Sequence, residues 1–138
     1  MAERTLGQRD LNRALLARQL LLERVRLPLP RVLERIGGIQ NQYAPNGYIR
    51  LFSCVEGFRR HDLTRALERR PVVQATLMRQ TIHLVSKRDF WPLALAVRAS
   101  HREWVLRVRK PPSDKRELER TARELRAALS DGPRPYDE

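Results

Sequence analysis

Two glutamines, Gln40 and Gln42, lie two residues apart, shortly after the double glycine Gly37-Gly38. In an extended segment residues i and i+2 project from the same face, so both amides would point the same way while Asn41 turns away. Each amide offers hydrogen-bond donors and an acceptor without carrying charge. We therefore expect the pair to be able to hold a water molecule or a sugar. The alternative is a backbone cap at a helix end, the commoner role for amides at such a position.

The chain around this pair is strongly basic. Its 138 residues include 28 Lys+Arg against 16 Asp+Glu, for a formal net charge of +12. A balance this basic attracts polyanions, and nucleic acid is the first candidate. Almost all the cations are arginines, which can also reflect GC-rich coding and a solvated surface. The candidate DNA-binding residues are Arg50, Arg59, Arg60 and Arg79, although Arg79 would equally suit a solvated turn.

Cysteine usage and hydropathy exclude several classes of protein. The single Cys54 cannot form an internal disulfide and has no second thiol for a zinc site, so we expect a buried, inert thiol and no metal or cofactor. Met78 also lies in an apolar run and is expected in the core. No stretch approaches the roughly 18 apolar residues of a membrane span. We expect a cytoplasmic protein.

Short helices followed by two strands should position the glutamines. Pro30 suits the first turn of a helix that Gly37 ends, and residues 39–43 should be extended. Residues 44–47 read as a turn. Two β-branched runs joined by Arg79-Gln80 predict a hairpin, and helices followed by a hairpin outline a winged helix. The expected helices cover residues 10–24, 30–36, 48–56 and 62–70, and the expected strands cover 72–78 and 81–85.

The remainder of the chain is predicted to be helical. One helix should begin near Asp89, with Trp91 and Trp104 as core anchors, and another should run from Asp114 to about Leu129 after a Ser113 cap. The expected fold class is therefore mainly α with a small β-hairpin (α+β), a winged helix-turn-helix followed by helices. We expect a winged-helix DNA-binding unit over residues 1–86 and a helical extension over 87–138.

Three segments carry a resemblance to a known family. They are residues 11–19, residues 36–43 and the run from Thr76 to Val85. Here the chain resembles bacterial winged-helix DNA glycosylases that unhook interstrand crosslinks, in which a Gln-x-Gln or Gln-x-Asp motif is catalytic. The resemblance places that motif at Gln40 and Gln42. Family proteins are longer, with several tandem winged helices, and the chain resembles their N-terminal part, so residues 87–138 should lead to further units that it lacks. Gln80 stands where the family has a glycine.

The chemistry of such a site must differ from that of ordinary glycosidases. Those enzymes use two carboxylates, and two glutamines can replace neither. An N7-alkylated purine, however, leaves as a neutral base from a cationic nucleotide, so no general acid is required. The amides would then place a water and tolerate positive charge on the sugar. No lysine lies near the pair in sequence, which leaves a Schiff-base lyase without a nucleophile.

The expected function is thus a monofunctional DNA glycosylase acting on alkylated or crosslinked double-stranded DNA. Whether the chain is itself an enzyme depends on the rest of the family scaffold. The alternatives are a non-catalytic winged-helix DNA-binding or transcription-regulator module, and an inert fragment. His83 lies in an apolar strand, so it is either a hydrogen-bonded core histidine or a group that faces the site near Gln42.

Overall fold

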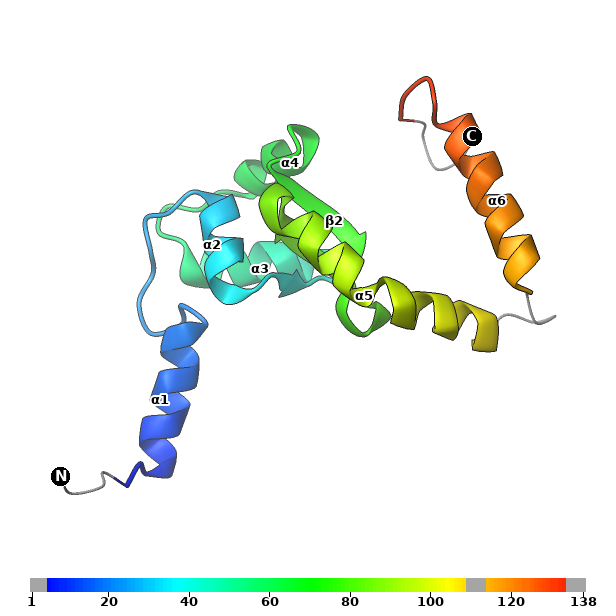
Figure 1. Ribbon diagram of the computed structural model, residues 1–138. Helices are drawn as coiled ribbons and strands as arrows, with labels where there is room; N and C mark the ends of the chain where they lie inside the picture. The colour runs from blue at the N-terminus through cyan, green and yellow to red at the C-terminus, as the bar shows by residue number, and fades with distance from the viewer. Residues whose placement is uncertain (1–4, 109–113, 134–138) are drawn as a thin grey trace. The chain divides into compact units, whose positions relative to one another are not determined.

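The computed structural model describes residues 5–108 and 114–133 (Figure 1). The chain divides into two units, residues 1–97 and 98–138, and each is described by itself. The elements are α1 (Gln8–Arg18), α2 (Leu29–Ile36), β1 (Ile39–Gln40), α3 (Pro45–Cys54), α4 (Arg60–Glu68), β2 (Val72–Thr76), the 3-10 turn η1 (Met78–Gln80), β3 (Ile82–Ser86), α5 (Lys87–Val108) and α6 (Lys115–Ala128). This mainly helical α+β architecture confirms the expected fold class. The division at residues 86 and 87 stays a prediction.

A small antiparallel sheet organises the first unit. Its strand order is β1-β3-β2, so β3 pairs on both sides, with Ile39 opposite Leu84 and Val73 opposite Val85. The hairpin of β2 and β3 matches the prediction. The pairing of β1 with β3 was not predicted, and β1 covers two residues rather than the expected five because the chain turns toward α3 after Asn41.

The connection between β2 and β3 differs from a two-residue turn. Arg79 and Gln80 both adopt left-handed backbone conformations, with φ of 51° and 59°. The prediction that Met78 is a core residue is wrong. The chain leaves the strand at Thr76, so Leu77 takes the inward position with 1% of its surface exposed, while Met78 is only half-buried.

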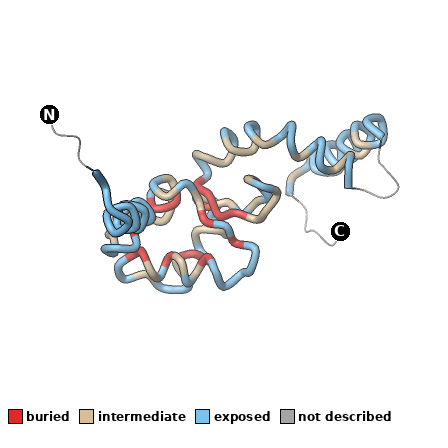
Figure 2. Tube along the Cα trace, turned by 90° about the horizontal axis from the view of Figure 1, so that it is seen from below, coloured by how far each residue is buried: buried red, intermediate tan, exposed pale blue. Residues whose placement is uncertain are grey.

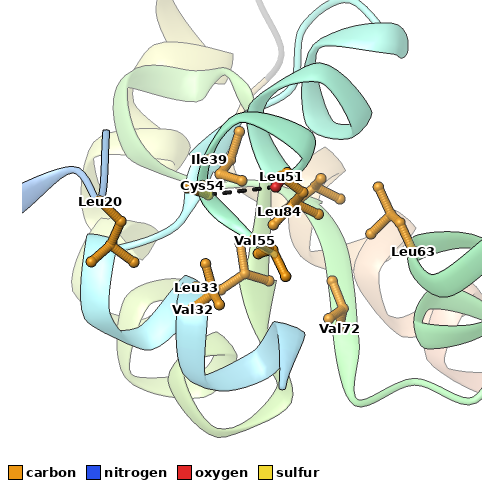
Figure 3. Close-up of a cluster of buried hydrophobic side chains, with 10 residues drawn as sticks. All are labelled: Leu20, Val32, Leu33, Ile39, Leu51, Cys54, Val55, Leu63, Val72 and Leu84. Atoms are coloured by element: carbon orange, nitrogen blue, oxygen red, sulfur yellow. Dashed lines mark hydrogen bonds between the residues drawn. The ribbon is translucent and has the colours of Figure 1, made fainter. Parts of the chain in front are cut away.

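The core lies where α2, α3 and α4 meet the sheet. Figure 3 shows Leu33, Leu51 and Leu63 from the helices converging with Val72 and Leu84 from the strands. All five are essentially inaccessible, and removing such apolar surface from water is what drives the helices onto the sheet. Cys54 is buried in the same cluster, as predicted.

The tryptophans do not anchor the core. The half-buried apolar residues of the first part of α5 are Phe90, Leu93, Ala94 and Val97, a helical i, i+3, i+4, i+7 pattern. Trp91 is one position off that stripe and is 66% exposed, with its ring edge against Phe90; Trp104 is 42% exposed. The helices α1 and α6 are also mostly exposed along their length, and neither contains a buried residue (Figure 2).

In the second unit, α6 begins at an N-cap. Asp114 is that residue, and its carboxylate accepts a hydrogen bond from the backbone N–H of Glu117 at 2.6 Å. Ser113, the cap expected from the sequence, lies outside the described residues. Arg102 and Glu119 form an ion pair at 3.1 Å within this unit.

Candidate active site

The segment that runs from the end of β1 into the loop before α3 carries both glutamines. Gln40 is the last residue of β1 and Gln42 follows the strand, and both are exposed. Asn41 between them is buried, with 5% of its surface exposed. This is the alternation expected of an extended segment, even though only Ile39 and Gln40 belong to the sheet.

Asn41 fixes this loop to three other parts of the fold. Its backbone N–H donates to the Ile82 carbonyl at 2.7 Å, and its side chain accepts from the Gly47 N–H at 2.7 Å. Its side-chain amide donates to the Oε1 of Gln74 at 3.1 Å. Buried polar groups are costly unless they are paired, so these bonds hold the loop in one conformation. Sequence reasoning treated Asn41 only as a residue turned away from the site.

Gly47 permits the close approach of α3 to this loop. A Cβ there would lie 2.5 Å from the Cδ1 of Leu84 and 2.9 Å from the Oδ1 of Asn41. The expected turn over residues 44–47 is wrong in this respect, because α3 already begins at Pro45, which suits the first position of a helix.

Both amide oxygens are bonded to the hairpin. The Oε1 of Gln40 accepts from the Nη2 of Arg79 at 2.9 Å, and the Oε1 of Gln42 accepts from the Ile82 N–H at 3.0 Å. Neither glutamine caps α2, because Gly37 ends that helix in a left-handed conformation and the Gly38 N–H bonds to the Leu33 carbonyl at 2.8 Å. The nitrogen end of each amide has no partner in the described hydrogen bonds.

A surface hollow lies beside the first amide, and we call it the Gln40 hollow. Its volume is about 410 Å³. Arg50 is part of its wall. Its guanidinium donates to the backbone carbonyl of Gln19 and also, at 3.0 Å, to the side-chain Oε1 of Gln19. A cation therefore lies in the same hollow as Gln40, whereas Gln42 is not part of the lining. The lining residues are Gln19, Gly38, Ile39, Gln40, Asn46, Ile49, Arg50 and Ser53.

A second hollow, about 540 Å³ and mostly apolar, shares Ile49 with the first. Phe52 in its wall is 55% exposed, and the guanidinium of Arg24 lies 4.7 Å from its ring centre. Exposed apolar groups that gather in a concave surface are typical of binding sites. Sequence reasoning missed this feature. Its lining residues are Ala44, Pro45, Tyr48, Ile49, Phe52, Phe58 and Arg60.

The family comparison covers both the loop and the hairpin. The family described as DNA glycosylase AlkZ-like matches residues 33–138. The chain belongs to this family. No curated protein and no solved structure matches the chain significantly. The resemblance read from the sequence is thereby confirmed, and membership of the AlkZ-like family gives the chain a role related to DNA-repair glycosylases, with DNA as the substrate of the family.

The four candidate DNA-binding arginines of this AlkZ-like chain fall in two places. Arg50 and Arg79 lie beside Gln40, as described above. Arg59 and Arg60 are exposed at the start of α4, where the Asp62 carboxylate accepts from the Arg59 N–H at 2.8 Å. Their contact with DNA stays a prediction.

His83 lies opposite Gln40 in the sheet but is buried, with 5% of its surface exposed. Its Nδ1 donates to the backbone carbonyl of Thr81 at 2.8 Å. This is the arrangement of a hydrogen-bonded core histidine. The other expectation, a group that faces the site near Gln42, stays a prediction.

Metal ligands do not cluster in residues 5–108 and 114–133. Within those ranges, no three or more His, Cys, Asp or Glu side chains gather as a metal site requires. The helices of the same ranges include none that is both long and apolar enough to cross a membrane.

Proposed function

We propose that this chain is a winged-helix, DNA-binding member of the AlkZ-like family that hydrolyses the N-glycosidic bond of N7-alkylated purines. Gln40 and Gln42 are the catalytic pair in this proposal. The observation that carries it is the family match over the loop in which both amides are exposed and tied to the hairpin. Crosslinked duplex is the second substrate we propose.

The order of the elements supports the winged helix. Three helices α2, α3 and α4, the short strand β1 between the first two, and a closing hairpin follow the sequence of that motif, with sheet order β1-β3-β2. In such a motif the second helix of the helix-turn-helix faces the major groove. That helix is α4, whose surface hollow is lined by Arg60, His61, Thr64, Arg65 and Glu68. In this proposal α4 makes the main protein–DNA contact, and Arg60, one of the four candidate arginines, lies on it.

The proposed reaction needs little from the protein. A water attacks the anomeric carbon of the deoxyribose, the glycosidic bond breaks, and its electron pair neutralises the departing N7-alkylpurine; the water proton passes to solvent. Positioned amides hold the water by hydrogen bonding, which lowers the barrier without a general acid. Arg50 and Arg79 lie beside Gln40 and are suited to the phosphates on either side of the lesion.

The exposure of the amides also suits a crosslinked substrate. Enzymes that act on a single base usually flip it into a pocket. A base tied to both strands cannot leave the duplex in this way, so its sugar must be reached at the surface. The Gln40 hollow is an open depression bounded by α3 and β1, and it supports attack on a nucleotide that stays in the helix.

A non-catalytic DNA-binding module is the second candidate. The basic surface of α4 is compatible with it, because a transcription regulator would need Arg60 and Arg65 as much as a glycosylase does. Such a module has no use for two exposed amides held by a hairpin.

Duplex DNA with one N7-methylguanine separates the two candidates. The proposal predicts abasic sites at the lesion when the chain is added, detected by alkaline strand cleavage, and none in unmodified duplex. Tight, salt-sensitive binding of both duplexes without abasic sites would overturn the glycosylase proposal and leave the binding module.

A further inference from the structure

We propose that Arg79 is a positioning residue for Gln40: its guanidinium holds the carbonyl end of the amide so that the nitrogen end faces the DNA. This inference rests on the proposed function for its catalytic consequence, but not for the contact itself. It assigns Arg79 a role beyond the phosphate contact suggested by its charge.

The directions of the hydrogen bonds carry the first step. Arg79 can only donate, so its 2.9 Å bond to Oε1 fixes which end of the Gln40 amide lies toward the hairpin. The Ile82 N–H does the same for Gln42 at 3.0 Å. Both glutamines therefore turn their NH₂ groups away from the hairpin.

The difference between the two donors carries the second step. The partner of Gln42 is a backbone group of β3, which no side-chain substitution removes. The partner of Gln40 is a side chain, and its bond is charge-assisted, which makes it stronger than a neutral one. The orientation of Gln40 thus depends on one replaceable residue, whereas that of Gln42 does not.

The hairpin turn delivers this side chain to the amide. Arg79 sits in a left-handed conformation inside a turn closed by bonds from the Gln80 N–H to the Leu77 carbonyl at 3.0 Å and from the Thr81 N–H to the Met78 carbonyl at 3.2 Å. The turn ends in β3, which pairs directly with Gln40. Arg79 and Gln40 are therefore held at the same sheet by backbone hydrogen bonds.

An amide fixed in this way can do two things at once. Its oxygen has two lone pairs, and Arg79 occupies one, so the other can accept from the O–H of a water. Its NH₂ group can donate to an oxygen of the nucleotide. Without Arg79 the amide can rotate by half a turn, and the water would lose its fixed orientation.

A double-mutant cycle tests the catalytic part. We expect Arg79→Ala to lower the single-turnover excision rate at saturating enzyme by about tenfold, the scale of one modest hydrogen bond in the transition state. In a Gln40→Ala background the same change should have no further effect, and Arg79→Lys should restore part of the loss. Arg35→Ala removes one exposed cation from α2 and serves as the matched control, with an unchanged saturating rate.

The side-chain amide signals of Gln40 and Gln42 test the contact without any activity. In Arg79→Ala the NMR order parameter of the Gln40 Nε2 group should fall, while that of Gln42 stays constant. An unchanged Gln40 order parameter would overturn the proposal. So would an excision loss that adds to that of Gln40→Ala, or a loss of affinity alone, which would leave Arg79 as a phosphate contact. If the wild-type chain excises nothing, the proposed function fails and the NMR comparison still decides the role of Arg79.

Discussion

The side-chain oxygen of Asn41 accepts a hydrogen bond from the backbone N–H of Gly47, 2.7 Å away, in the interior of the protein. This bond joins the loop that carries both glutamines to the first turn of α3. It depends on a glycine, because any Cβ at position 47 would lie 2.9 Å from the accepting oxygen. The exposed amides on either side of Asn41 are thus positioned by a buried one.

Asn41→Ala should therefore destabilise the fold. The substitution leaves the Gly47 N–H buried without a partner, a loss of about 1–3 kcal/mol in the free energy of unfolding. Urea denaturation followed by circular dichroism measures it. Asn46→Ala, at an exposed position of α3, is the control and should change little. Equal stability of the two variants would refute the anchoring role of Asn41.

Gln80→Gly should stabilise the protein. A left-handed conformation costs a non-glycine residue about 1–2 kcal/mol, and the extra freedom of glycine in the unfolded chain returns roughly 0.5–1 kcal/mol of that. The expected net gain is about 0.5 kcal/mol, seen as a higher thermal midpoint. Thr76→Gly in β2 has no such strain to relieve and should lower the midpoint. A lower midpoint for Gln80→Gly would show that its side chain contributes more than its backbone costs.

The thiol of Cys54 should react slowly in the native state. The residue is fully buried, and burial raises the pKa of the thiol, opposed by the nearby Arg50 and by a backbone hydrogen bond. The Cys54 thiol thus keeps its proton to a higher pH in the folded protein than in the unfolded chain. The stability that comes from this difference in proton binding is fully present below the pKa of the unfolded chain, and it is lost as the pH rises above that value. Labelling with a thiol reagent at neutral pH should be slow without denaturant and fast in urea. Rapid native labelling would contradict the buried position.

DNA binding should be salt-sensitive and should use α4. With a net charge of +12, log Kd should rise linearly with log salt, with a slope of about 0.9 for each phosphate contacted. Arg65→Ala should reduce that slope by about 0.9, the value for one phosphate contact. Arg35→Ala on α2 is the matched control and should leave the slope unchanged. Affinity that does not depend on salt would exclude the nucleic-acid role.

The sequence predicted what local chemistry determines. Proline at the start and glycine at the end placed α2, and β-branched runs placed β2 and β3. The pairing of β1 with β3 could not be predicted from local patterns, because it joins residues more than forty positions apart, such as Ile39 and Leu84. Leu77 is buried instead of Met78 because the turn that follows holds Arg79 and Gln80 in left-handed backbone conformations. Neither residue is a glycine, so the sequence did not indicate such a turn.

The site was predicted in part for the same reason. The alternation of Gln40, Asn41 and Gln42 follows from strand geometry and could be read directly. The bond from Arg79 to Gln40 could not, since it depends on the sheet that brings the hairpin turn beside β1. The second, mostly apolar hollow, which shares Ile49 with the Gln40 hollow, depends likewise on how α3 meets the start of α4.

Excision of N7-methylguanine by Gln42→Ala tests the central claim most directly. The side chain is exposed, so the free energy of unfolding should change by no more than about 1 kcal/mol and the Kd for DNA should stay nearly constant. Gln8→Ala, at an exposed position of α1, is the matched control. We predict a single-turnover excision rate at saturating enzyme that is roughly 10²-fold lower for Gln42→Ala, the scale for losing one positioned polar group. Equal rates for Gln42→Ala, Gln8→Ala and the wild-type chain would show that the water is held elsewhere.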